Sequence, residues 1–102
     1  MYDLRISEVA DQDLDTIIKY ISVDLANPEA AKNILDKLEN VYLFLKDSPL
    51  MYSVCDDSRL KAKAYRKVLI GNYILIFRIE KFPRRVYILR FFYGAQDYLT
   101  QL

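Results

Sequence analysis

The sequence predicts an α+β domain with two layers, in which an N-terminal strand precedes an antiparallel helix hairpin and three further strands. Apolar residues recur with helical spacing over residues 8–46, alternate with polar residues near the start, and fill three short segments over residues 65–93 that turns separate. Two amphipathic helices joined by a short link bury their apolar faces against one face of a sheet. We therefore expect a mainly antiparallel sheet, in the order β-α-α-β-β-β, with its second face open.

The size and composition of the chain suit a small globular protein. Its 102 residues suffice for a single domain over residues 1–102, and 53% hydrophobic content with 2 Gly and 3 Pro predicts a folded chain. No apolar run approaches the roughly 20 residues of a membrane-spanning helix, and the start lacks the pattern of a secretory signal. The single Cys55 suits a reducing compartment. We expect a cytoplasmic protein that does not associate with membranes.

A change in the spacing of apolar residues separates the first predicted strand from the first predicted helix. Tyr2, Leu4 and Ile6 alternate with polar residues, which indicates a half-buried strand. Ser7 can then cap a helix, and acidic residues in the next turns suit the positive end of the helix dipole. The helix is expected over residues 8–25. Its apolar face comprises Ala10, Leu14, Ile17, Ile18, Ile21 and Leu25.

The second helix is expected over residues 28–46. Asn27 can cap it, and Pro28 suits its first position because no hydrogen bond is lost there. The very short link makes the two helices an antiparallel hairpin. The apolar face of the second helix comprises Ala31, Ile34, Leu35, Leu38, Val41, Tyr42 and Leu45.

Residues 48–63 show no clear period, and a loop of this length is usually functional or mobile. Strands follow over residues 65–69, 73–80 and 85–93, with turns at 71–72 and 81–84. A two-residue turn at Gly71 places Lys67 opposite Ile76. A turn longer by one residue would exchange the faces of Arg66 and Lys67. We favour the first register.

Side chains alternate between the two faces of a strand. In the last two strands the odd-numbered residues carry no charge, so we expect them beneath the helices: Tyr73, Leu75, Phe77, Ile79, Tyr87, Leu89, Phe91 and Tyr93. The open face then carries Tyr65, Lys67, Arg78 and Arg90 beside Ile74, Ile76, Ile88 and Phe92. Apolar residues rimmed by cations suit an acidic protein segment or a nucleic acid backbone. Alternatively, Arg78 and Arg90 pair with Glu80, Asp97 or the C-terminal carboxylate and merely solubilise the sheet.

Charge is distributed unevenly along the chain. Residues 1–50 carry five basic and ten acidic side chains, whereas residues 51–102 carry ten basic and four acidic ones. This asymmetry indicates an anionic partner for the basic half, or two solvated faces of opposite sign. The chain has no His, which excludes a Ser-His-Asp triad, a Cys-His pair and a His-ligated zinc. We expect no metal site and no cofactor.

Three stretches resemble the RelE/ParE superfamily of type II toxins. Residues 65–77, with Tyr65-Arg66-Lys67 ahead of Gly71-Asn72-Tyr73, are similar to its second hairpin, and residues 86–98 (VYILRFFYGAQDY) are similar to a ParE-type ending. The opening strand and amphipathic helix also fit. The resemblance covers nearly the whole chain and implies a toxin whose open face is covered by a cognate antitoxin. RelE-like members cleave mRNA in the ribosomal A site, whereas ParE-like members inhibit DNA gyrase without covalent chemistry.

Departures from the nuclease pattern bear on the choice of target. Ile74 stands where RelE-type nucleases place an Arg, and Tyr93 stands where the family often has His. Arg90 within Ile-Leu-Arg favours the ParE side, although Gln96 replaces the usual Arg before Asp97. We therefore expect DNA gyrase as the target. The alternatives are a ribosome-dependent mRNA endonuclease and a degenerate, non-toxic antitoxin-binding protein.

The resemblance and the basic face together give the expected site. Partner-binding or target-binding candidates are Lys61, Lys63, Tyr65, Lys67, Arg78, Arg90, Tyr93 and Tyr98. Were the chain a nuclease, its catalytic candidates would be Lys67, Arg90, Tyr93 and Tyr98. A Tyr with an ordinary pKa near ~10 is a poor base at neutral pH unless a cation lies beside it.

Overall fold

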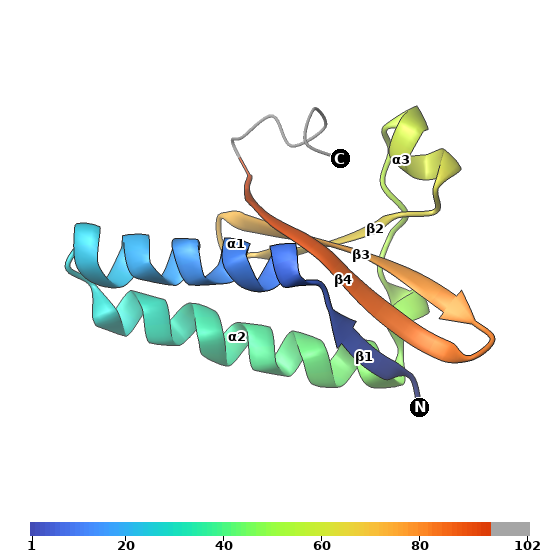
Figure 1. Cartoon of the computed structure of the whole chain (residues 1–102), viewed down its shortest axis with the longest axis horizontal. Helices are drawn as coiled ribbons and strands as arrows, with labels where there is room; N and C mark the ends of the chain where they lie inside the picture. Colours follow the sequence, from blue (N-terminus) through green and yellow to red (C-terminus); the bar gives the residue numbers. More distant parts are fainter. Residues whose placement is uncertain (95–102) are drawn as a thin grey trace.

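The computed structural model describes residues 1–94 of the chain (Figure 1). Its elements in chain order are β1 (Asp3–Ile6), α1 (Glu8–Lys19), a π-helical turn (Tyr20–Asp24), α2 (Pro28–Asp47), a 3-10 turn (Pro49–Met51), α3 (Ser58–Ala62), β2 (Arg66–Ile70), β3 (Tyr73–Lys81) and β4 (Arg84–Tyr93). The sheet has the order β1-β4-β3-β2, with β1 parallel to β4 and the other pairs antiparallel. The α+β class and the element order are confirmed. Within residues 1–94, no helix is long and apolar enough to cross a membrane.

Both long helices begin at the predicted caps. The Ser7 hydroxyl accepts the Ala10 N–H at 3.0 Å, and the Asn27 side chain accepts the Ala30 N–H at 3.1 Å. The first helix differs from its prediction because α1 continues after Lys19 as a π-helical turn. There the Ser22 hydroxyl donates to the Ile18 carbonyl at 2.7 Å, which is the carbonyl that the α-helical bond of Ser22 would use. This competition favours a wider turn.

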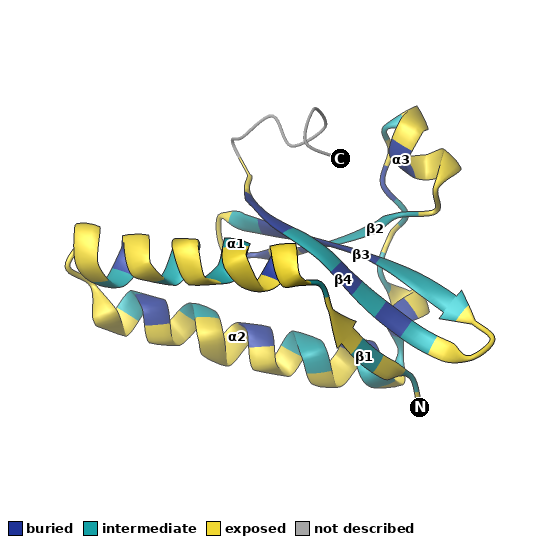
Figure 2. Cartoon of the chain, in the orientation of Figure 1, coloured by how far each residue is buried: buried dark blue, intermediate teal, exposed yellow. Residues whose placement is uncertain are grey.

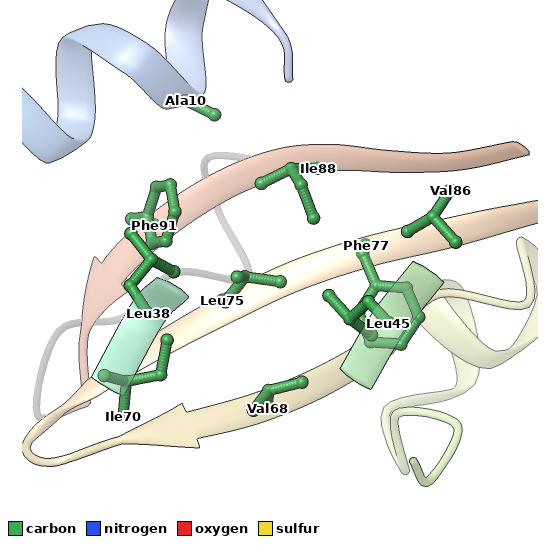
Figure 3. Close-up of a cluster of buried hydrophobic side chains, with 10 residues drawn as sticks. All are labelled: Ala10, Leu38, Leu45, Val68, Ile70, Leu75, Phe77, Val86, Ile88 and Phe91. Carbon is green, nitrogen blue, oxygen red and sulfur yellow. The ribbon is translucent and has the colours of Figure 1, made fainter. Parts of the chain in front are cut away.

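The main core lies between the two long helices and one face of the sheet (Figure 3). Its buried members are Ala10, Leu38, Leu45, Val68, Ile70, Leu75, Phe77, Val86, Ile88 and Phe91. Burying a large apolar side chain contributes about 1.5–3 kcal/mol, so this layer dominates stability. Figure 2 shows the outward sides of α1 and α2 exposed. Leu25 and Leu35, predicted on the apolar stripes, are also exposed; Leu25 follows the π-helical turn at the hairpin tip, which projects past the sheet (Figure 1).

The β2–β3 register follows the two-residue turn. Gly71 has φ +58°, Ile70 pairs with Tyr73, and Lys67 pairs with Ile76, as the favoured register predicts. A positive φ suits glycine because a side chain would strain this conformation. The preferred facing of Lys67 is therefore confirmed.

The β3–β4 register contains a β-bulge that strand alternation did not predict. Ile76 pairs with Arg90 but Phe77 pairs with Ile88, so Leu89 is an extra residue in β4. An extra residue inverts the faces of the residues on one side of it. Ile88, together with Val86, therefore packs beneath the helices, while Leu89 and Tyr87 lie on the opposite face. The predicted placements of Ile88, Tyr87 and Leu89 were wrong for this reason.

The segment between α2 and β2 covers part of the face that was expected to be open. Cys55 and Leu60, from this segment and α3, pack on Ile74, Ile76 and Phe92 in a second buried cluster. Backbone bonds fix the segment beside β2, since the Cys55 N–H donates to the Tyr65 carbonyl at 2.8 Å. The sheet face away from α1 and α2 is here called the outer face. It is apolar and covered only at the end where Ile74, Ile76 and Phe92 lie.

Candidate functional site

The outer face gathers four of the predicted site residues. Tyr65, Lys67, Arg78 and Arg90 share it, because Lys67 and Arg90 both pair with Ile76 and Arg78 lies two residues further along β3. Tyr65 packs at the margin of the second buried cluster. Lys67, Arg78 and Arg90, one cation from each of β2, β3 and β4, therefore lie on one surface, as predicted.

The uncovered end of the outer face carries an arginine–tyrosine cluster, made of Arg78, Arg85 and Tyr87. The Arg78 guanidinium lies over the Tyr87 ring at 4.1 Å from its centroid, and Arg85 Nη1 donates to the Tyr87 hydroxyl at 3.2 Å. The hydrogen bond from Arg85 to Tyr87 raises the pKa of Arg85. Arg78 also pairs with Glu80 at 3.3 Å, as the alternative interpretation predicted. The cluster thus holds two permanent cations around one ring.

Arg85 and Tyr87 were absent from the predicted site. Tyr87 was assigned to the helix side because the bulge at Leu89 was not foreseen. One feature of the sequence indicates that the face of Tyr87 is uncertain. Apolar residues run from Val86 to Leu89 without interruption, so they occupy both faces and leave the alternation ambiguous.

Arg90 is anchored to the first helix. Its Nε donates to Asp13 Oδ2 at 2.7 Å and its Nη2 donates to Oδ1 at 3.1 Å, while the two side chains are 21% and 17% exposed. The bond to Asp13 raises the pKa of Arg90. The predicted partner Glu80 instead pairs with Arg78, and Asp97 lies outside the described residues. Arg90 therefore has a structural role in joining α1 to β4.

The remaining basic candidates lie at the covered end of the outer face. Lys61 and Lys63 are exposed at the end of α3, whose Leu60 is buried and fixes the helix to the sheet. The Lys63 ammonium lies 5.7 Å from the centroid of the Tyr65 ring. These two lysines extend the positive surface beyond the strands.

Tyr93 lies on the helix-facing side of the sheet, away from Lys67. Its ring contacts that of Tyr73 edge-on, with 5.7 Å between centroids. Both belong to a groove of about 650 Å³ between α1 and the end of β4, together with Asp13, Thr16, Ile17, Tyr20, Leu25, Asn72, Arg90, Phe91 and Phe92. Tyr98 lies outside the described residues. Among residues 1–94, the candidate nuclease side chains are therefore split between two faces.

The tyrosines and the cysteine whose pKa values are raised are poor bases and nucleophiles. Burial raises the pKa of Tyr42 to about 12, with a further contribution from Asp11, and burial also raises the pKa of Tyr52 and Tyr73. Burial likewise raises the pKa of the Cys55 thiol, which is 2% exposed. A raised pKa disfavours the anion that would accept a proton or attack. Within residues 1–94, no three His, Cys, Asp or Glu residues gather as a metal site would require.

Comparison with known proteins gives the family. A family model described as the ParE toxin of the type II toxin–antitoxin system parDE matches residues 4–98. The chain belongs to the ParE toxin family. This family membership makes it the toxin component of a type II toxin–antitoxin system, with an antitoxin as partner, as the resemblance of its hairpin and ending implied.

A solved structure supports the fold of this ParE-family toxin. A chain from the chromosomal ParDE system of P. aeruginosa is similar, with a TM-score of 0.70, 20% identity, and coverage of 91% of this chain and 96% of that chain. At this identity the likeness concerns the fold alone. The comparison with curated proteins found no match.

Proposed function

We propose that this ParE-family toxin stops growth by binding DNA gyrase in the cytoplasm, without covalent chemistry, and that its cognate antitoxin silences it. The observation that carries the proposal is the split of the catalytic candidates, because Lys67 lies on the outer face and Tyr93 lies on the helix-facing side. What the outer face offers is a set of oriented cations, and such a set is suited to binding.

The chemistry of RNA cleavage supports the same choice. Cleavage needs a group that takes the 2′-OH proton and a cation that stabilises the charge developing on the phosphate. Arg90 is held in a two-point ion pair with Asp13, so its charge is already compensated. Lys67 lies on the outer face beside Ile76, and Tyr98 lies outside the described residues. Inhibition by binding needs none of these groups to change protonation.

A ribosome-dependent mRNA endonuclease is the second candidate. It is favoured by the positive margin of the outer face, where Lys63 stacks on Tyr65 and Lys61 and Lys67 lie nearby in the chain. Cations beside an aromatic ring suit a stacked base and its phosphate. If this activity exists, Lys67→Ala should abolish cleavage of mapped transcripts.

The deciding experiment is a supercoiling assay with purified chain, purified DNA gyrase and relaxed plasmid. We expect loss of supercoiling as toxin is added. Relaxation of the supercoiled form of the same plasmid by topoisomerase I serves as the control and should be unaffected. Gyrase that remains fully active at large toxin excess would contradict the proposal. Pulse labelling after induction separates the alternatives: thymidine incorporation falls first for gyrase, amino-acid incorporation falls first for a nuclease, and undisturbed growth indicates a non-toxic binding protein.

A further inference from the structure

The turn between β3 and β4 forms an exposed end of the sheet, here called the ribbon tip and made of Lys81, Phe82, Pro83 and Arg84. All four residues are exposed, and none belongs to the predicted site. We propose that the ribbon tip is a DNA-binding site that enters the major groove of a duplex. Duplex binding goes beyond the proposed function, in which the toxin binds the gyrase protein, and it does not rest on that target.

The ribbon tip extends past both edge strands of the sheet. Pairing of β1 with β4 begins at Asp3, opposite Arg85, and pairing of β2 with β3 begins at Arg66, opposite Phe77. Residues 81–84 therefore belong to a ribbon of two strands that neither edge strand flanks (Figure 1). Figure 2 shows this turn exposed. A ribbon of two strands can enter a groove that is too narrow for the whole sheet.

Two cations face one another across the ribbon tip. Lys81 and Arg84 are opposite each other in the β3–β4 register, and among residues 1–94 neither forms an ion pair. The Arg84 guanidinium lies 5.8 Å from the centroid of the Tyr2 ring, a contact that leaves its charge uncompensated. Like charges directly opposite one another destabilise a strand pair. The fold thus gains nothing from these two charges, and both are available to an anionic partner.

Cations lie on both faces of this ribbon. Strand alternation places Lys81 and Arg84 on the helix-facing side, as is Val86 two residues further along β4. Arg85 lies on the outer face, where it binds the Tyr87 hydroxyl. The major groove of DNA is about 12 Å wide, admits a two-stranded β-ribbon and has a phosphate backbone along each wall. A flat anionic surface such as a membrane would meet the cations of one face only, so the arrangement favours the groove.

The carboxylates nearest in the register lie behind the ribbon tip. Glu80 is already paired with Arg78 at 3.3 Å, and Asp3 lies opposite Arg85. Residues 81–85 carry three cations and no carboxylate. The field at the leading end of the ribbon therefore attracts phosphates.

Phe82 occupies the leading end of the ribbon. Its side chain is 92% exposed, so it contributes little to the core. In a major groove, a Phe side chain can contact the methyl group of thymine, and this contact removes apolar surface from water. The ribbon tip thus offers cations for the two walls of the groove and one apolar side chain for its floor.

Fluorescence anisotropy of the full chain with a short, fluorescein-labelled DNA duplex tests this site. The tip variant combines Lys81→Gln with Arg84→Gln. The matched control combines Lys32→Gln with Lys37→Gln, which removes the same charge from exposed positions of α2. We expect the tip variant to bind the duplex at least about tenfold more weakly, and the control to change by less than about threefold. The slope of log affinity against log salt should become shallower by about two in the tip variant, since about one counterion is released per phosphate contact.

Phe82→Ala separates the apolar contact from the ionic contacts. We expect it to weaken duplex binding by at least about threefold and to leave the salt slope unchanged, because it removes no charge. The tip variant should resist urea at least as well as the wild type, since it removes a pair of like charges. Unchanged duplex affinity in the folded tip variant overturns the proposal, as does a wild-type chain that fails to bind the duplex at low salt.

Two further measurements distinguish other partners. If the tip variant loses binding to vesicles of phosphatidylglycerol and phosphatidylcholine but keeps its duplex affinity, the ribbon tip binds lipid and the proposal is wrong. If the tip variant keeps its duplex affinity but needs more toxin to inhibit gyrase, the ribbon tip contacts the gyrase protein, and the proposal is again wrong. Failure of the wild-type chain to inhibit gyrase would instead overturn only the proposed function, because duplex affinity is measured without the enzyme.

Discussion

Asp13 and Arg90 join α1 to the last third of β4 through a two-point ion pair. The carboxylate accepts Arg90 Nε at 2.7 Å and Nη2 at 3.1 Å, and it also accepts the Phe91 backbone N–H at 3.0 Å. Strand β1 ceases to pair with β4 after Ile88. Beyond that point the Asp13 side chain occupies the place of a strand partner, so one carboxylate satisfies both a backbone group and a cation at the sheet edge.

Replacing Asp13 should therefore destabilise the fold. Asp13→Ala removes the acceptor of the Arg90 guanidinium and of the Phe91 N–H, while these donors remain partly buried. We expect a loss of about 1–3 kcal/mol in the free energy of unfolding. Urea denaturation measures it, with Asp15→Ala, an exposed residue of the same helix, as the control. Equal stability of the two variants would show that the Asp13–Arg90 pair contributes nothing.

Ser7 links the same two elements from the start of α1. Its hydroxyl accepts the Ala10 N–H at 3.0 Å and donates to the Leu89 carbonyl at 2.8 Å, at the bulge. Ser7→Ala should cost about 1–2 kcal/mol, because a helix cap and a hydrogen bond to the strand are lost together. Thermal unfolding should show a lower Tm. Ser7→Asp, which retains the cap acceptor but not the donor, should recover part of the loss.

The core layer predicts a contrast between two leucines of α2. Leu45 is fully buried against the sheet, whereas Leu43 is 61% exposed. Leu45→Ala should lower stability by about 2–5 kcal/mol, since it leaves a cavity, while Leu43→Ala should change it by less than about 0.5 kcal/mol. Parallel urea titrations measure both. A comparable loss at Leu43 would indicate that this side chain is covered in solution, for example by a second copy of the chain.

Tyr42 should make the fold sensitive to alkali. Burial, with Asp11, raises its pKa to about 12 from the ordinary 10.0. As the pH rises from 10 to 12, the unfolded chain loses the phenol proton before the folded one does. The contribution of the protonated Tyr42 side chain to the free energy of unfolding is therefore complete below pH 10. It is lost as the pH rises through the folded pKa of about 12.

Tyr42→Phe should weaken this alkaline loss of stability. Unfolding free energies measured at pH 9 and pH 11 should differ less in the variant than in the wild type. At neutral pH the variant should be as stable as the wild type or slightly more so, because the Tyr42 hydroxyl is buried without a hydrogen-bond partner among residues 1–94. An unchanged difference between the two pH values would assign the effect to Tyr52 or Tyr73.

The sequence by itself determined the features that depend on neighbours along the chain. The caps at Ser7 and Asn27, the helix hairpin, and the turn at Gly71 with its register follow from local hydrogen bonding and backbone preference. The gathering of Tyr65, Lys67, Arg78 and Arg90 on one face followed from that register and from strand alternation. The family resemblance likewise rested on contiguous stretches.

Tertiary structure alone decided the rest. The bulge at Leu89 could not be read from a strand whose apolar residues suit both faces, because its position depends on which side chains the helices bury. It moved Tyr87 to the outer face and created the cluster with Arg78 and Arg85. The partner of Arg90 is 77 positions away in the chain, and the cover over Ile76 comes from a segment without periodicity. Such contacts between distant residues are set by packing, which no local pattern encodes.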